Sequence, residues 1–136
     1  MSQPTNDDLE RSYEGVRVLV AEDEPLAAKL ALGALRLMGI TQVVVAEDGL
    51  EAMKQLSDHN GDFQLIISDW NMPNMTGIEF LRTVRKIYPQ MPFIMLTSNA
   101  NKEFVLAAAK HGINGYIAKP FSLDQMRQKV EAIFKI

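Results

Sequence analysis

Short apolar runs alternate with longer segments of helical spacing along most of the chain. The apolar runs are bounded by polar or turn residues, as buried strands usually are. They lie at Val16–Ala21, Gln42–Ala46, Gln64–Ser68, Pro92–Leu96 and Gly115–Ala118. The segments that follow them carry apolar residues three or four positions apart, which is typical of amphipathic helices. The pattern therefore predicts five strands and five helices in alternation.

The first predicted helix opens at Glu24 and Pro25, because proline is well tolerated in a first helical turn. Glu24 is expected to be a solvated acid there, since a helix N-terminus favours negative charge. Apolar residues recur on one face of this helix, at Leu26, Leu30, Ala34 and Leu37. The fourth predicted helix covers residues 102–111 and stops at Gly112.

The other three helices begin with a capping residue followed three positions later by Glu or Gln. These pairs are Asp48 with Glu51, Thr76 with Glu79, and Ser122 with Gln125. Strands that alternate with helices imply a parallel sheet covered on both faces, so the expected fold is a doubly wound α/β domain. In such folds the functional site lies beyond the carboxyl ends of the strands.

The first 13 residues are polar and acidic, with one large aliphatic residue. We expect a solvated tail over residues 1–13 and one domain over residues 14–136. This start lacks the basic and apolar regions of a signal peptide, so a cytoplasmic location is expected. No apolar run reaches about 18 residues, which argues against a membrane-spanning helix.

Composition excludes several kinds of chemistry. The 136 residues contain no cysteine, which rules out disulfides, cysteine-ligated metals and a thiol nucleophile. The two histidines do not form an HExxH pair, which argues against a zinc hydrolase. Lys and Arg number 14 against 17 Asp and Glu, for a net charge of -3, so a nucleic-acid-binding face is not expected.

Chemistry-bearing residues follow four of the predicted strands. Glu22 and Asp23 follow the first strand, Asp69 the third, Thr97 the fourth and Lys119 the fifth. Because the carboxyl ends of parallel strands share one edge of the sheet, these side chains should converge. Carboxylate oxygens are hard ligands that suit Mg²⁺. A lysine among them suits phosphoryl oxygens, to which it presents a point charge.

A carboxylate in line with a phosphoryl donor can attack it and form an acyl phosphate. We expect Asp69 to be this nucleophile, because it ends the central strand and leads into a loop rich in Asn, Pro and Gly. Asp23 lies in an acidic run that is better suited to the metal. Thr97 either caps the following helix or donates its hydroxyl to a phosphoryl oxygen.

The segments LVAEDEP, IISDWNMPNMTG, IMLTSNA and GYIAKPF resemble the receiver domain of two-component response regulators. The resemblance extends from about Val16 to Ile136 and leaves no room for an output domain. It implies the flavodoxin-like strand order 2-1-3-4-5. SDWNMPNM and GYIAKPF are most similar to the single-domain receivers of chemotaxis.

This resemblance implies roles for individual residues. Asp69 would be the phosphoacceptor, while Thr97 and Lys119 would bind the phosphoryl group. Glu22, Asp23 and Asp69 would hold Mg²⁺ with the backbone carbonyl of Asn71.

Other residues would tune and transmit the reaction. Tyr116 would be the switch aromatic that moves with Thr97, and the Lys119–Pro120 bond would be cis. Asn71 and Asn99 would adjust the lifetime of the acyl phosphate, and Asn99 stands where the chemotaxis proteins carry an acid.

The resemblance also implies partners. A histidine kinase or phosphotransfer protein would supply the phosphoryl group. A protein target would bind the face formed by the fourth helix, the fifth strand and the last helix, in chemotaxis or motility signalling. Phe104 and Val105 are adjacent, so one of them is a candidate exposed contact. The chain would be no enzyme beyond its own phosphorylation and autodephosphorylation.

Three alternatives remain. The protein could be a phosphate shuttle or sink in a phosphorelay with no motor target. A phosphatase of the haloacid dehalogenase type would carry DxDxT after the first strand, where this chain has EDEP. A flavodoxin-type FMN carrier would need a phosphate-binding loop in the same place, where these acids would repel the phosphate.

Overall fold

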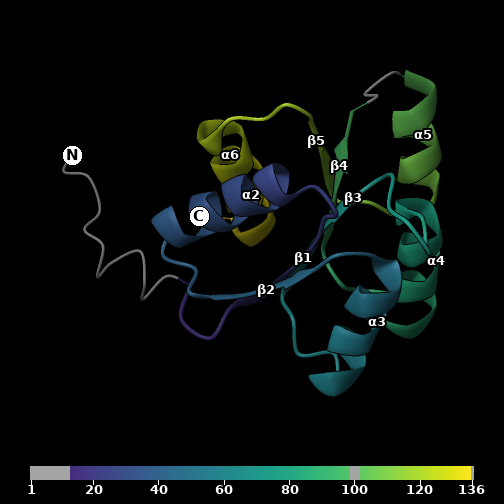
Figure 1. The fold of residues 1–136 in the computed structure, drawn as a ribbon, viewed down its shortest axis with the longest axis horizontal. Coiled ribbons are helices and arrows are strands. Elements are labelled where there is room, and N and C mark those ends of the chain that lie inside the picture. Colours follow the sequence, from purple (N-terminus) through teal and green to yellow (C-terminus); the bar gives the residue numbers. More distant parts are fainter. Residues whose placement is uncertain (1–12, 99–101, 136) are drawn as a thin grey trace.

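The computed structural model describes residues 13–98 and 102–135, in which strands and helices alternate (Figure 1). The described strands form a single parallel sheet in the order β2-β1-β3-β4-β5. Their bounds are β1 Arg17–Ala21, β2 Gln42–Ala46, β3 Leu65–Asp69, β4 Phe93–Thr97 and β5 Gly115–Ala118. The doubly wound five-stranded fold is therefore confirmed, with every strand bound within one residue of the prediction.

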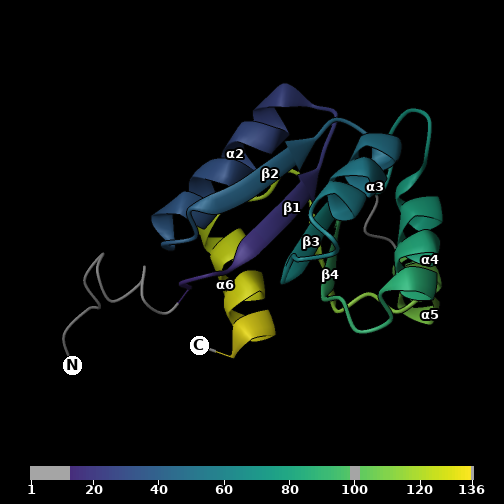
Figure 2. The same cartoon turned by 90° about the horizontal axis from the view of Figure 1, so that it is seen from below.

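Helices cover both faces of this sheet. Their bounds are α2 Pro25–Leu37, α3 Gly49–Asp58, α4 Gly77–Ile87, α5 Lys102–Lys110 and α6 Leu123–Phe134. Figures 1 and 2 show α2 and α6 on one face of the sheet and α3, α4 and α5 on the other. Within the described ranges, no helix has both the length and the apolar character needed to cross a lipid bilayer.

The predicted capping residues start three of the helices. The side chains of Thr76 and Ser122 accept the backbone N–H three residues on, and those of Glu79 and Gln125 accept the N–H of the capping residue in return. Asp48 accepts an N–H in the same way at the start of α3. These bonds satisfy backbone donors that a helix leaves unpaired at its first turn.

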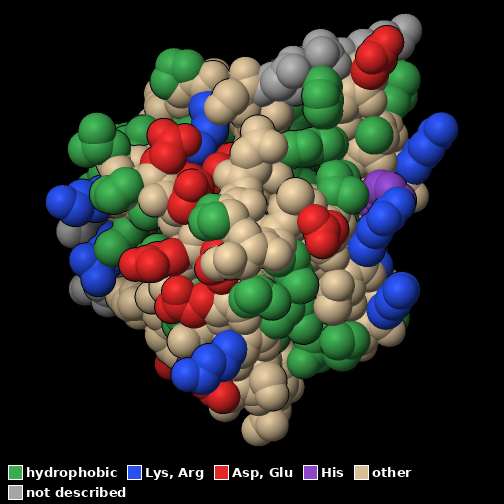
Figure 3. All heavy atoms as spheres, turned by 45° about the vertical axis from the view of Figure 1, so that its right-hand side comes forward, with side chains coloured by type: hydrophobic (Ala, Val, Ile, Leu, Met, Phe, Trp, Pro, Cys, Tyr) green, Lys and Arg blue, Asp and Glu red, His purple; other side chains and the backbone are tan. Residues whose placement is uncertain are grey.

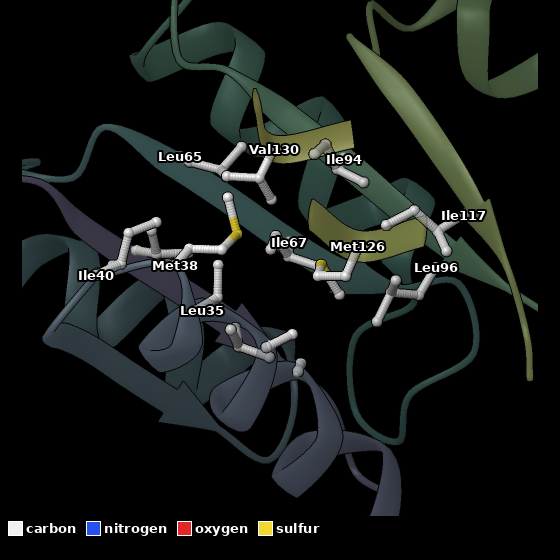
Figure 4. Packing of buried hydrophobic residues seen from close by; sticks show 14 of the residues in the cluster. Leu35, Met38, Ile40, Leu65, Ile67, Ile94, Leu96, Ile117, Met126 and Val130 are labelled. Atoms are coloured by element: carbon white, nitrogen blue, oxygen red, sulfur yellow. The ribbon is translucent and has the colours of Figure 1, made fainter. Parts of the chain in front are cut away.

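The core has two layers, one on each face of the sheet. Because successive strand residues point to opposite faces, β1 gives Val18 and Val20 to one layer and Leu19 and Ala21 to the other. Figure 4 shows the first layer, in which α2 and α6 pack on the strands through Leu35, Met38, Met126, Val130, Leu65, Ile67, Ile94 and Leu96.

Helix α2 buries only part of the predicted face, because Ala34 lies in the core and Leu30 packs against it, but the two leucines at the ends of that face do not. Leu26 is 82% exposed and Leu37 is 67% exposed, whereas Ala31, Ala34 and Leu35 are buried. The segment PLAAKLALGALRL is apolar on nearly every side, so the spacing of its leucines does not select the inward face. Ala31, Ala34 and Leu35 face the sheet, and Leu26 and Leu37 are left at the surface.

Tyr13 is the last residue of the predicted tail and the first that the structure describes. Its side chain is buried, and its ring packs edge to face on Phe134 with the centroids 5.6 Å apart. The packed domain therefore includes one residue more than expected. The remainder of the predicted tail, residues 1–12, lies outside the described residues.

Candidate functional site

The parallel register places four of the predicted residues along one edge of the sheet. Glu22 follows β1, Asp69 ends β3, Thr97 ends β4 and Lys119 follows β5. The first three are buried, with exposed fractions of 2% for Glu22, 4% for Asp69 and 3% for Thr97. Burying polar groups is unfavourable unless they have partners, so this edge is a place where partners are expected.

Lys119 joins the acids of this edge. Its Nζ lies 2.7 Å from Glu22 Oε1, 2.9 Å from Glu24 Oε1 and 3.4 Å from Asp69 Oδ1. The side chain of Lys119 is only 9% exposed, so these contacts lie largely out of solvent. The ammonium of a residue that follows β5 thus contacts acids that follow β1 and an acid that ends β3.

Burial sets the protonation of these groups. It raises the pKa of Glu22 to about 7, although the Lys119 ammonium and the backbone N–H of Glu24 act to lower it. Burial also raises the pKa of Asp69, against the opposing effect of Lys119. For Lys119 burial acts to lower the pKa, but the contacts with Glu22 and Glu24 outweigh it and raise the pKa. Lys119 therefore stays charged. Its single positive charge does not balance the negative charges that the carboxylates around it carry when they are ionised.

The carboxylates around Lys119 form a group that could hold a cation. Glu22, Glu24 and Asp69 each offer an oxygen, and the three atoms lie within 4.8 Å of one another. Glu22 Oε1 is buried without a hydrogen bond, and it forms an ion pair with the Lys119 ammonium. Figure 3 shows acidic side chains gathered left of centre on this view, with lysines and arginines beside them and others at the right edge. The donor set suits a divalent cation that prefers oxygen ligands.

This group includes Glu24 where we had predicted Asp23. Asp23 is exposed, and its charge acts to raise the pKa of Asp69. The expectation that Glu24 is merely a solvated acid was wrong, because its carboxylate binds Lys119 although its side chain is 63% exposed. A glutamate just before α2 gave no sign of this contact, since its partner lies 95 residues further along the chain. The metal role of Asp23 stays a prediction.

The chain after Asp69 folds closely around that residue. The backbone N–H of Trp70 donates to Asp69 Oδ1 at 2.9 Å, and Gly77 at the start of α4 lies against the same segment. A Cβ on Gly77 would stand 2.3 Å from the carbonyl oxygen of Asp69, so only glycine fits this approach. The side chain of Asn74, whose φ is 68°, donates to Asp48 Oδ2 at 2.7 Å and ties the loop to α3.

The remaining predicted residues are less closely joined to the site. Asn71 is exposed, and Tyr116 is 37% exposed with the ammonium of Lys129 lying 5.5 Å from its ring centroid. Asn99 lies outside the described residues. The bond between Lys119 and Pro120 is cis, as the resemblance implied.

Comparison with known proteins agrees with this geometry. Residues 18–131 match the family model described as the response regulator receiver domain. The chemotaxis protein CheY of Pseudomonas aeruginosa is 36% identical over 122 residues, which cover 88% of this chain and 97% of that protein. CheY-3 of Vibrio cholerae is 34% identical over 124 residues, which cover 90% of this chain and 94% of that protein.

A solved structure has the same fold. The high-resolution structure of CheY4 of Vibrio cholerae aligns with a TM-score of 0.80 at 31% identity, over 87% of this chain and 98% of that one. The sheet order, the acids around Asp69 and the lysine after β5 thus occur in a chain whose sequence matches one family over most of its length. The chain belongs to the response regulator receiver domain family and is CheY-like.

Proposed function

We propose that Asp69 accepts a phosphoryl group from a histidine kinase or a phosphotransfer protein, and that this reaction switches the binding of a protein partner. One observation carries the proposal: a buried carboxylate lies 3.4 Å from a lysine ammonium at the carboxyl edge of the sheet. An uncompensated acid at this position would be protonated, whereas a charge-paired acid can serve as a nucleophile.

In the proposed reaction a carboxylate oxygen of Asp69 attacks the phosphorus of a phosphohistidine. The new P–O bond forms as the P–N bond breaks, and the departing imidazole keeps the electron pair and takes up a proton. Lys119 would hold phosphoryl oxygens as a point charge, and Thr97 would donate its hydroxyl to another. The protein would thus catalyse only its own phosphorylation and the later hydrolysis of its acyl phosphate.

Mg²⁺ fits this site by the chemistry of its donors. Glu22 offers a buried oxygen without a hydrogen bond, and the oxygens of Glu24 and Asp69 lie near it. Asp23 and the backbone carbonyl of Asn71 complete the proposed set. When bound, the cation neutralises charge on phosphoryl oxygens. The protein's own part is to keep these carboxylates together and largely shielded from water.

An apolar groove beside the site suits the approach of the phosphodonor protein. Its volume is about 480 Å³, and it is lined by Glu24, Leu26, Ala27, Leu30, Ser98, Lys119, Pro120 and Phe121. Glu24 and Lys119 therefore belong both to the groove and to the ionic cluster around Asp69. A donor protein that covered Leu26 would bury apolar surface and bring its phosphohistidine to the carboxylate.

The output of the switch would be protein binding. We place the target on the face formed by α5, β5 and α6, where Phe104, Tyr116 and Leu123 are exposed apolar or aromatic side chains. The relatives are chemotaxis proteins, so we propose a role in chemotaxis or motility signalling within the cytoplasm. A phosphate shuttle or sink without a motor target is the alternative.

Phosphorylation with acetyl phosphate tests the proposal directly. In the presence of Mg²⁺ the wild type should gain one phosphoryl group that hydroxylamine removes, detected by intact mass, and it should gain none when the metal is chelated beforehand. Asp69→Asn should gain none, whereas Asp58→Asn, an exposed acid at the end of α3, should behave as the wild type does. Incorporation by Asp69→Asn at the wild-type rate would exclude this residue as the acceptor.

A binding experiment distinguishes the two proposed outputs, which are motility signalling and a phosphate shuttle or sink. The beryllofluoride-bound protein should capture a motor-switch protein if the output is motility. If it captures only histidine-containing phosphotransfer proteins, the shuttle is the better description.

A further inference from the structure

An aromatic pair connects the segment after Asp69 to helix α5. The rings of Trp70 and Phe104 meet edge to face, with centroids 5.3 Å apart and planes at 82°. Trp70 is the residue after the proposed phosphoacceptor, and Phe104 lies in the first turn of α5. The pair therefore joins the reactive edge to a helix that follows the next strand.

The backbone of Trp70 is held on several sides. Its N–H lies 2.9 Å from Asp69 Oδ1 and also 2.9 Å from the carbonyl of Leu96, and its own carbonyl accepts the N–H of Gly77 at 2.7 Å. The N–H that faces the carboxylate is thus part of a residue whose indole rests on Phe104. The indole and this N–H belong to the same residue, so a shift of the indole would move the N–H that contacts the carboxylate.

Helix α5 is attached to the rest of the protein by few buried side chains. Ala108 is the one residue of α5 in the buried core among those whose side chains the structure describes. Phe104 is 36% exposed and Leu106 is 52% exposed. The ring contact with Trp70 is therefore one of the contacts that position the first turn of this helix.

We propose that Phe104 is a positioning residue for the reaction at Asp69: its ring holds the Trp70 indole, and so links the N–H that faces the carboxylate to the first turn of α5. This inference rests on the proposed function, because it concerns the same carboxylate. Phe104 is not one of the reacting groups, and its contact with the site is the ring of Trp70. Removing the ring should slow phosphorylation and uncouple α5 from the site.

Three substitutions separate the ring from the bulk of the side chain. Phe104→Tyr keeps the ring, Phe104→Leu keeps apolar volume without it, and Phe104→Ala removes both. Leu106→Ala is the matched control, because Leu106 is an exposed apolar residue of the same helix. Two quantities are measured: the rate of phosphorylation by acetyl phosphate with Mg²⁺, and the change in amide hydrogen exchange of α5 when beryllofluoride and Mg²⁺ are added.

The wild type, Phe104→Tyr and Leu106→Ala should react at similar rates and show the same change in exchange over α5. Phe104→Ala and Phe104→Leu should react roughly two- to tenfold more slowly, as expected for the loss of one aromatic pair, and lose that change. Alanine could also slow the reaction by loosening α5 itself. Phe104→Leu keeps the apolar volume, so an equal effect of leucine and alanine would show that the loss of the ring is the cause.

Two results would overturn the inference alone. In the first, the leucine and alanine variants match the wild type in both quantities. In the second, the tyrosine variant is as impaired as alanine, so that the ring has no special role. A wild type that neither reacts nor responds to beryllofluoride with Mg²⁺ would instead overturn the proposed function, and this inference with it.

Discussion

Helices α4 and α5 cover the same face of the sheet but are held in different ways. Helix α4 buries Gly77, Phe80, Leu81 and Val84, and the ring of Phe80 lies 5.7 Å from that of Phe93 in β4. Helix α5 buries Ala108 among the side chains the structure describes. One helix is part of the core, and the other rests on it.

Two contacts tie the ends of α5 to the rest of the domain. Phe104 meets Trp70 at the first turn, and beyond the last turn the guanidinium of Arg85 donates to the carbonyl of Gly112. Elements with few buried contacts open and shift at lower free energy than core elements. The difference predicts that α5 shifts at lower free energy than the sheet and α4, as the proposed partner-binding switch would require.

The largest loss is expected in α4. Phe80→Ala should lower the free energy of unfolding by about 3–5 kcal/mol, because it leaves a cavity against Phe93. Chemical denaturation measures it, and Phe80→Leu should lose clearly less. A loss below about 1 kcal/mol would mean that α4 is no better anchored than α5.

Gly77→Ala should lower the free energy of unfolding by about 1–3 kcal/mol, because the new Cβ would press on the backbone of Asp69 and Trp70. Gly33→Ala in α2 is the matched control, since a Cβ there meets nothing within 4 Å. That variant should gain about 0.5–1 kcal/mol from helix propensity. Equal effects at the two glycines would argue against the close approach of α4 to the backbone of Asp69.

Arg85→Met should lower the free energy of unfolding by about 1–3 kcal/mol, because the carbonyls of Gly112 and Met91 lose a charged donor. Amide exchange should rise at residues 110–114, next to the end of α5, more than in the middle of α4. Arg82→Met, at an exposed site on the same helix, serves as the control. Uniform protection in the variant would show that Arg85 does not anchor α5.

The smallest effect is expected for Leu106→Ala in α5, which should change the free energy of unfolding by less than about 0.5 kcal/mol. The same substitution at Leu81, fully buried in α4, should lose about 2–5 kcal/mol. Denaturation of the two variants side by side gives the comparison in one experiment. Similar losses would remove the distinction between the helices.

The alternating pattern predicted every strand within one residue, because each strand is a short apolar run between turn residues. The same pattern placed Glu22, Asp69 and Lys119 at one edge, since parallel strands share their carboxyl ends. For these features local spacing and sheet topology are sufficient. The strand order came from the resemblance, because spacing alone does not order a parallel sheet.

Other features depend on contacts that spacing does not contain. Leu26 faces solvent because α2 is apolar on both sides, and packing decides which side turns inward. Glu24 binds Lys119 only because two distant segments end at the same edge. The ring pair of Trp70 and Phe104 depends on the tilt of α5, which no pattern of apolar residues specifies.

The ionised side chains at the edge of the sheet that holds Asp69 do not balance in charge. When ionised, Glu22, Glu24 and Asp69 carry three negative charges against one positive charge on Lys119, which leaves a deficit of two. One divalent cation would supply that charge, whereas the raised pKa of Glu22, about 7, lets a proton supply part of it. Proton and cation would then compete for the same oxygens, so that cation entry near neutral pH releases a proton. Affinity for the metal would rise with pH, and the proposed switch would respond to acidity as well as to phosphate.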